Sequence, residues 1–415
     1  MRTVLVTGPG GAGRTTVAAA TALAAARDGA RTLLISADPI PGFPDATAPT
    51  PVTAGLRSVR IDSAAHFRGE LLALQDQLSS VLELLGGNPL DGEELTELPG
   101  SGELALLHAL RRAAHGDWSA GAYDLLVVDL PPLRDALRLL ALPEQLRRYL
   151  RRLLPQERQA ARALRPMLAQ LAGVPMPAQW LYEAAARRDA ELAQVQALIE
   201  DRSTTLRLVA EPGPAADEAL RTARTGLALH GLRAEAPVAN RLLPGHSPDP
   251  FFAALAAQQE KSLGHWADEG AAAPVRIAHL GRDPQGPDDL LALAGGDGAG
   301  GAGGGGGAGG GGNALAVSGT GEEGGRAPDP WWTEEAGGPD GDGILVWCLR
   351  LPGAVKKDLQ LVRRGGELLL TVRPFHRIVP LEPALRRCTV SGAALTDGVL
   401  RVRFTPDPAL WPRTG

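Results

Sequence analysis

The sequence predicts an α/β protein with a mainly parallel sheet, followed by a small all-β sandwich at its C-terminal end. Three apolar runs, at residues 2–7, 31–36 and 123–129, are followed or closed by Gly, Asp or Pro. Helical patterns separate these runs, as expected for buried parallel strands in successive βαβ units. Far along the chain, short strand-like segments alternate with turn residues. We therefore expect two domains of different class.

The first domain is expected to span residues 1–293. Two further candidate strands, 206–210 and 236–240, continue its strand series. Leucine-rich helical patterns at about 65–115 and 130–202 indicate helical insertions between the strands.

A glycine-rich stretch follows this domain. Its composition cannot bury enough apolar surface to fold, which predicts a flexible linker over residues 294–342. A coil of about 36 such residues has a root-mean-square span of about 30–36 Å. The β domain is expected at 343–406. Its candidate strands are residues 344–351, 359–362, 367–372 and 399–404.

The composition excludes several classes of protein. Lys and Arg total 42 against 47 Asp and Glu, so the chain has a net charge of -5 and no basic footprint for nucleic acid. No apolar run approaches the roughly 20 residues that span a bilayer, and no signal peptide is recognisable. Cys348 and Cys388 lie close to the C-terminal end and cannot form a disulfide framework. We expect a cytoplasmic protein that is not integral to a membrane and binds no nucleic acid.

The pattern Gly8-x4-Gly13-Arg14-Thr15 lies between a predicted strand and a predicted helix, the context of a phosphate-binding loop. Glycines let backbone N–H groups approach phosphate, and the helix N-terminus adds partial positive charge. Thr15 is placed to put its hydroxyl on Mg²⁺. The alternative is a glycine turn without a ligand. The candidate nucleotide-binding residues of the loop are Gly8, Gly10, Gly11, Ala12, Gly13, Arg14, Thr15 and Thr16.

The loop lacks the lysine that such loops normally carry. The first lysine of the chain is Lys261, so no nearby lysine replaces it. Arg14 keeps the charge, but its planar guanidinium differs from a compact ammonium group. Pro9 has neither a charge nor a backbone N–H donor. Nucleotide binding is therefore predicted more firmly than hydrolysis.

The loop resembles the deviant Walker A motif of the ArsA (arsenite-efflux) and tail-anchored-protein-targeting ATPases, and of the related MinD/ParA group. Two further segments favour the ArsA branch. Ser36-Ala37-Asp38-Pro39 resembles its switch I, and Asp129-Leu130-Pro131-Pro132 resembles its switch II. The resemblance covers about residues 1–293. It implies a P-loop NTPase that binds ATP or ADP with Mg²⁺ and closes as a dimer around nucleotide.

The resemblance also implies roles for single residues. Asp38 would orient the attacking water or the metal, as the catalytic residue. Asp38 and Asp129 would hold Mg²⁺ together with Thr15. Glu211 and Asn240 match positions that contact the nucleotide, and the Asn240 amide can read an adenine edge. In the family a loop lysine at the position of Pro9 reaches the phosphates of the partner subunit, which proline cannot do.

The C-terminal segment is similar to the small heat-shock (α-crystallin-like) domain appended to some ArsA-type ATPases. The residues that carry this similarity are Leu351-Pro352-Gly353, Gly365-Gly366-Glu367-Leu368 and Asp397-Gly398-Val399. A generic β-sandwich adaptor is the alternative.

Arsenite capture needs clustered thiolates, and the first domain contains no cysteine. The CxxC motif of zinc-sharing relatives is also missing, so we expect no zinc and no metal besides Mg²⁺. The histidines, among them His66 and His108, show no ligand spacing along the chain. Solvated or internally hydrogen-bonded histidines are therefore expected.

Residues 146–171 combine arginines with leucines at helical spacing. Such a face could line a groove for a hydrophobic protein client or make peripheral contact with an anionic membrane. A packed helix with a solvated charged face is the alternative.

The sequence thus supports an ArsA-type ATPase with slow or partner-dependent hydrolysis that handles clients or membrane proteins. Its expected partner is a second copy, or a related ArsA-type subunit with an intact loop. A non-hydrolysing scaffold or chaperone-like adaptor is the alternative, and a MinD/ParA-like positioning ATPase is less favoured.

Overall fold

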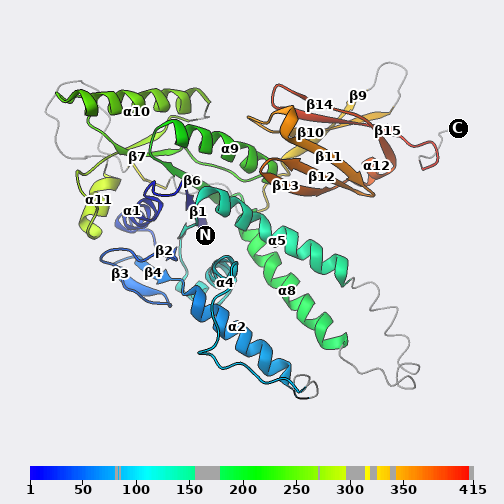
Figure 1. Cartoon of the computed structure of the whole chain (residues 1–415), viewed down its shortest axis with the longest axis horizontal. Coiled ribbons are helices and arrows are strands. Elements are labelled where there is room, and N and C mark those ends of the chain that lie inside the picture. Colours follow the sequence, from blue (N-terminus) through cyan, green and yellow to red (C-terminus); the bar gives the residue numbers. More distant parts are fainter. Residues whose placement is uncertain are drawn as a thin grey trace.

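The computed structural model describes an α/β domain built on one eight-stranded sheet, together with a pair of antiparallel sheets at the C-terminal end (Figure 1). The fold class expected from the sequence is confirmed. The described residues are 1–79, 83, 86–154, 178–269, 272–295, 314–317, 325–336 and 343–410.

The strands of the large sheet run in the order β3-β4-β2-β5-β1-β6-β7-β8. Every neighbouring pair is parallel except β3 and β4. Parallel strands end at the same edge, so the carboxyl ends of β1, β5 and β2 lie next to one another. The strands are β1 (Arg2–Thr7), β2 (Thr32–Ser36), β3 (Thr50–Thr53), β4 (Leu56–Arg60), β5 (Leu125–Asp129), β6 (Thr204–Ala210), β7 (Val238–Leu242) and β8 (Val275–Ala278).

All five expected strands of this sheet are present within a few residues of their predicted bounds. The structure adds β3, β4 and β8, at or next to the ends of the sheet. These strands have four or five residues and include polar positions such as Arg57 and Arg276. They lack the continuous apolar run that marks a buried central strand, which is why the sequence pattern missed them.

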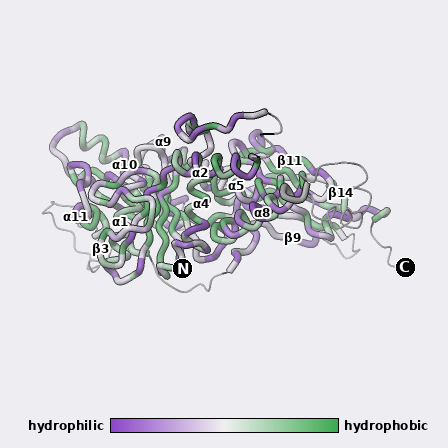
Figure 2. The backbone as a smooth tube through the Cα atoms, turned by 90° about the horizontal axis from the view of Figure 1, so that it is seen from below, coloured by the Kyte–Doolittle hydropathy of each residue, from purple (hydrophilic) through white to green (hydrophobic). Residues whose placement is uncertain are grey.

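Helices cover both faces of the sheet. On one face lies α1 (Arg14–Arg27), whose residues 17–26 are all buried, packed beside α11 (Pro287–Ala294). The opposite face is covered by α4 (Ser101–His115), α5 (Leu133–Leu153) and α9 (Pro214–His230). The hydrophobic strand segments gather between these layers, next to the N-terminus (Figure 2).

Four helices form a layer that extends away from the sheet (Figure 1). They are the α2–α4 pair and the α5–α8 pair, and α4 also packs on α8. These helices occupy the two insertions expected at about 65–115 and 130–202. The bounds of the other described α-helices are α2 (Ser63–Gln77), α8 (Ala178–Ile199), α10 (Pro250–Glu269) and, in the C-terminal domain, α12 (Pro383–Arg386).

The arginine-rich end of α5 is held by ion pairs. Arg147 lies 3.1 Å from Asp189 of α8, and Arg151 lies 3.2 Å from the same carboxylate. Arg148 lies 2.7 Å from Glu367 in the C-terminal domain. This part of the basic face is therefore a packing surface, as in the packed-helix alternative. The rest of the segment, residues 155–171, lies outside the described residues.

The C-terminal domain consists of two antiparallel sheets, β14-β15-β10-β9 and β11-β12-β13. Trp347 and Phe404 are fully buried in its core, and Cys348 and Cys388 are buried and unpaired. The strands are β9 (Trp331–Ala336), β10 (Ile344–Arg350), β11 (Leu359–Arg364), β12 (Glu367–Val372), β13 (Phe375–Pro380), β14 (Cys388–Thr396) and β15 (Val399–Pro406).

Parts of the expected linker, 294–342, are packed onto the domains. β9 lies within this range and pairs with β10. Leu315 is buried, and Arg207 of β6 donates to its carbonyl oxygen at 3.1 Å. The glycine composition hid these segments, because a few apolar residues such as Trp331 and Leu315 suffice to anchor a chain that is otherwise a poor folder.

The two domains are in direct contact through Arg377 of β13. Its side chain is 6% exposed and donates to the carbonyl oxygen of Leu229 at 2.7 Å. It also lies 3.3 Å from Glu144 of α5, and its guanidinium stacks 5.0 Å from the ring centroid of Trp331. The C-terminal domain therefore packs on both α5 and α9.

Within the described part of the chain, no helix combines the length and apolar character needed to cross a membrane.

His230, at the end of α9, makes this contact sensitive to acid. Burial, together with the charge of Arg377, lowers the pKa of His230 to about 3. In the unfolded chain a histidine takes up its proton near pH 6.5. As the pH falls from about 6.5 toward 3, the unfolded state binds a proton that the folded state does not. The free energy of unfolding therefore falls as the pH drops through this window, and above about pH 6.5 His230 causes no such loss.

Between pH 7 and pH 5, we expect the free energy of unfolding of His230→Leu to fall by about 1–2 kcal/mol less than that of the parent, as measured by urea unfolding. His246→Leu, which removes an exposed histidine, is the matched control and should follow the parent. Parallel pH profiles for all three proteins would show that His230 does not titrate in this way.

Candidate nucleotide-binding site

The loop between β1 and α1 lies at the carboxyl edge of the sheet. Gly8 follows β1 directly, and a Cβ atom there would lie 1.8 Å from the carbonyl oxygen of Val209. Glycine is therefore required for the loop to pass the end of β6. Gly11 and Gly13 have φ angles of 80° and 85°, in the left-handed region that favours glycine. These glycines set the path of the loop.

Helix α1 begins at Arg14 without a side-chain cap. Gly13 is the N-cap residue, so the first N–H groups of the helix gain no side-chain acceptor from it. The first turn contains no acidic residue. Unsatisfied N–H groups and the positive end of the helix dipole favour an anion here. The backbone thus supplies an anion-binding end that does not depend on the side chain of residue 14.

Asp129, at the end of β5, joins three segments of the site. It is 4% exposed, and its Oδ2 accepts hydrogen bonds from Thr15 Oγ1 at 2.6 Å and Ser36 Oγ at 2.9 Å. Burial raises the pKa of Asp129, and Thr15, Arg14 and Ser36 oppose the rise. Its Oδ1 is buried and accepts no hydrogen bond from any residue that the structure describes. This oxygen is a strong acceptor left without a donor.

The expected Mg²⁺ ligands were Thr15, Asp38 and Asp129. Mg²⁺ prefers oxygen ligands, and proteins often supply only one or two, leaving the rest to water and phosphate. Oδ1 of Asp129, which accepts no hydrogen bond from the described residues, and the adjacent hydroxyl of Thr15 fit that requirement. Asp38 is exposed, and Ser36 Oγ accepts from its backbone N–H at 3.1 Å and lies 2.9 Å from its carbonyl oxygen. Ser36 therefore connects the switch I segment to Asp129.

Arg14 is turned toward the end of β5. Its guanidinium donates to the carbonyl oxygen of Leu130, and Nη1 lies 4.0 Å from Asp129 Oδ1. A divalent cation and Arg14 would therefore compete for the same carboxylate oxygen. Pro9 accepts a backbone hydrogen bond from Ala12 at 3.3 Å but presents no charge. The side chains at these two positions fit the nucleotide less well than the backbone does.

Asn240 and Glu211 lie on the side of the loop away from Asp129. Asn240 is buried and donates to the carbonyl oxygen of Ala12 at 2.9 Å. Glu211 is half exposed and lies 3.7 Å from Arg241. Arg241 in turn donates to the carbonyl oxygen of Gly11 at 2.9 Å. The structure therefore brings Asn240 directly against the loop, and Glu211 only through Arg241.

A small cavity of about 40 Å³ opens beside Gly13, Thr16 and Asn240. His279 and Arg282, which follow β8, complete its wall. An amide, an imidazole and a guanidinium are groups that can hydrogen-bond or stack on a nucleobase.

Sequence reasoning missed Ser36 and Arg241 as site residues. Ser36 stands in the switch I segment, and its position at the end of a parallel strand was a usable signal. Arg241 has a φ angle of 59°, at an irregular end of β7, which turns it toward the loop. Neither spacing nor residue type indicates that turn.

Two of the histidines that show no ligand spacing along the chain lie together in the structure. His66 of α2 and His108 of α4 have ring centroids 4.7 Å apart, with Glu70 beside them. The two residues belong to different helices, so their separation along the chain could not reveal the contact.

We expect Gly8→Ala to lower the free energy of unfolding by about 1–3 kcal/mol, because its Cβ would collide with backbone. Gly10→Ala is the matched control, since its Cβ would meet nothing within 4 Å. Denaturant unfolding without nucleotide measures both. Equal losses for the two variants would contradict the close approach of Gly8 to β6.

Comparison with known proteins follows the same division of the chain. A family model for anion-transporting ATPases of the ArsA type matches residues 1–280, and one for an HSP20-like domain found in ArsA matches residues 342–404. The chain is 54% identical to "Uncharacterized protein SCO2128" of Streptomyces coelicolor over 420 residues, which is 100% of each chain. It is 29% identical to "Protein Rv2184c" of Mycobacterium tuberculosis over 445 residues, covering 99% of this chain and 97% of that one.

A third relative shares the first domain. The "Putative arsenical pump-driving ATPase" of Chlorobaculum tepidum is 27% identical over 286 residues, covering 66% of this chain and 70% of that protein. The resemblance drawn from the motifs is confirmed: the chain belongs to the ArsA ATPase family and carries the HSP20-like domain found in that family.

Proposed function

We propose that this chain binds ATP or ADP with Mg²⁺ at the loop of residues 8–16, and that it hydrolyses ATP slowly or only with a partner. The observation that carries the binding proposal is the buried Oδ1 of Asp129, which accepts no hydrogen bond from the described residues and lies beside Thr15 at the uncapped start of α1. Family membership supports the same ligand. Bound Mg²⁺ would supply a positive charge that shields the phosphates and polarises the bond to be cleaved.

Different residues of the chain are proposed to bind different parts of the nucleotide and its ion. Backbone N–H groups of the loop and of the first turn of α1 hold phosphate oxygens, and Thr15 and Asp129 provide oxygens for the ion. Asp38 is proposed to position the attacking water, with Ser36 fixing its backbone. Asn240 and Glu211 are proposed to lie toward the nucleoside, where Asn240 borders the small cavity.

Pro9 and Arg14 support the slow or partner-dependent part of the proposal. Proline carries no charge to a partner's phosphates, and Arg14 is engaged with Leu130 and Asp129. A related subunit with an intact loop would supply the missing cation across the dimer. We therefore propose a homodimer of low activity or a heterodimer of higher activity.

A non-hydrolysing scaffold is the second candidate. The contact of Arg14 with the carbonyl oxygen of Leu130 favours it, because a cation held on the protein cannot stabilise charge on a phosphate. In either case we propose a cytoplasmic protein that handles a hydrophobic client. Leucines on the extended helices and the HSP20-like domain support that role.

We expect nucleotide-free protein to bind MgATP with one site per chain in calorimetry and to release phosphate slowly. Pro9→Lys/Arg14→Lys should raise turnover by at least about tenfold, because one well-placed donor is worth roughly 10²–10³ in rate. If the parent binds MgATP stoichiometrically without turnover, and the double variant does turn over, the natural protein is a non-hydrolysing scaffold and the proposal of an ATPase is wrong. A fully active homodimer would refute the need for a second type of subunit.

The variant Asp129→Asn tests the binding of Mg²⁺ separately from the binding of the nucleotide. It keeps the shape of the side chain but removes the charge, so Mg²⁺ should no longer tighten ATP binding. Asp76→Asn removes an exposed carboxylate on α2 and is the matched control. If Mg²⁺ tightens binding equally in both variants, Asp129 does not hold the ion.

A further inference from the structure

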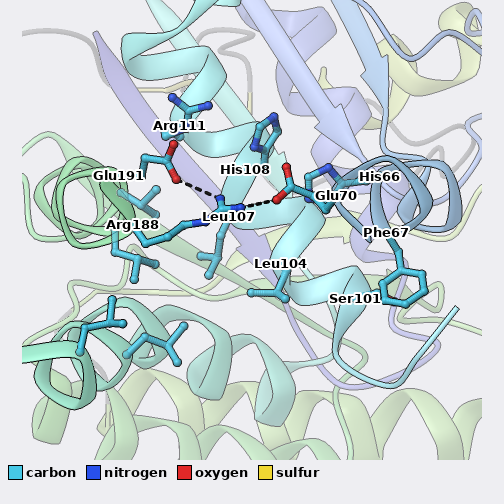
Figure 3. Close-up of a pocket in the computed structure, with 14 residues that line it drawn as sticks. His66, Phe67, Glu70, Ser101, Leu104, Leu107, His108, Arg111, Arg188 and Glu191 are labelled. Atoms are coloured by element: carbon cyan, nitrogen blue, oxygen red, sulfur yellow. Dashed lines mark hydrogen bonds and ion pairs between the residues drawn. The ribbon is translucent and has the colours of Figure 1, made fainter. Parts of the chain in front are cut away.

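A second, larger cavity lies among the extended helices α2, α4, α5 and α8. It has a volume of about 360 Å³ and a mostly apolar wall that includes Phe67, Leu104, Leu146 and Val195. Polar side chains from α2, α4 and α8 gather on another part of its lining (Figure 3). The hydrogen bonds around Asp129 involve none of these residues, so the cavity is separate from the nucleotide loop.

Three of these polar side chains form a compact set. His66 and Glu70 stand one turn apart on α2, and His108 faces them from α4 (Figure 3). Each offers one atom with a free lone pair, and the three atoms lie within 4.8 Å of one another. Residues four apart share one face of a helix, so α2 presents two ligands to the third on its neighbour. Two imidazoles and one carboxylate are a ligand set that transition metals accept.

Burial at this site favours the neutral form of both imidazoles. Burial lowers the pKa of His66, aided by Arg188 and Arg112 and opposed by Glu70. Burial also lowers the pKa of His108, aided by His66, Arg111 and Arg112. Burial works against the ionisation of Glu70, but the hydrogen bond and charge of Arg188, together with His66 and His108, outweigh that effect and lower its pKa.

We propose that His66, Glu70 and His108 bind a divalent transition-metal ion of the zinc type, which joins α2 to α4 at the wall of this cavity. The ion is chosen by the donors. Mg²⁺ prefers oxygen ligands only, whereas Zn²⁺ and Co²⁺ bind imidazole nitrogen together with carboxylate oxygen. Three protein ligands leave a fourth position for water or a small ligand from the cavity.

The set needs only a small contraction to hold such an ion. Zinc bonds of 2.0–2.2 Å in tetrahedral geometry place ligand atoms about 3.4 Å apart. The present limit of 4.8 Å therefore has to shorten by about 1.4 Å. Glu70 is exposed and can rotate toward the two imidazoles.

Arg188 of α8 is the competitor for Glu70. It forms an ion pair with Glu70 and a second one with Glu191, whose Oε2 lies 3.0 Å from Nη1. When Glu70 turns to the metal, Arg188 keeps Glu191 as a partner. The exchange therefore leaves no buried charge unpaired. Removing the Arg188 charge should favour the metal, because one competitor and one nearby cation are lost.

The test uses the full-length protein without a histidine tag, stripped with a chelator and titrated with Co²⁺ and then Zn²⁺. We expect one Co²⁺ per chain, with visible d–d absorption that Zn²⁺ abolishes. His66→Ala and His108→Ala should each weaken binding by more than the roughly 10–100-fold seen when only a group that orients a ligand is lost. Arg188→Gln should tighten binding.

His115→Ala is the matched control, because His115 is an exposed histidine on the same helix as His108. It should bind Co²⁺ like the parent. Absence of saturable binding by the parent, or equal affinity of the parent and both cluster variants, overturns the proposal. The parent is measured directly, so a variant that fails to fold cannot hide the answer. The assay contains no nucleotide, and its result is independent of whether the loop binds ATP.

Discussion

One buried carboxylate holds the nucleotide edge of this protein together. Asp129 receives hydrogen bonds from Thr15 at the start of α1 and from Ser36 at the end of β2, while Arg14 lies beside it. A buried charge is costly unless donors surround it, so these segments must meet at one point. Because Ser36 also binds the backbone of Asp38, the position of switch I depends on the same carboxylate.

Local signals explain what the sequence could predict. Apolar runs mark central strands, and a glycine pattern between strand and helix marks the loop, so the parallel sheet and residues 8–16 could be placed. Asp38 and Asp129 could be placed at one edge because parallel strands end together. Arg241 could not, since a left-handed φ angle at a strand end decides where it points. His66 depended on the packing of two helices, which no spacing encodes.

Composition is a poor guide to structure where a few large apolar residues order a glycine-rich segment. The segment expected as linker is rich in glycine, yet Trp331 belongs to a strand and its ring lies against that of Trp347, with ring centroids 6.1 Å apart. Burial of large aromatic surface can overcome the ordering entropy of its flexible neighbours. The arginines of α5 left two alternatives open in the sequence, because a basic stripe facing ion-pair partners has the same pattern as one facing solvent.

Helix α5 contacts both the nucleotide loop and the C-terminal domain. At one end the N–H of Leu133 bonds to the carbonyl oxygen of Gly8 at 2.9 Å, and near the other end Arg148 is paired with Glu367. Leu133 and Arg148 are 15 residues apart, which is about 22 Å along a helix. Helix α5 thus connects the nucleotide loop directly to the HSP20-like domain.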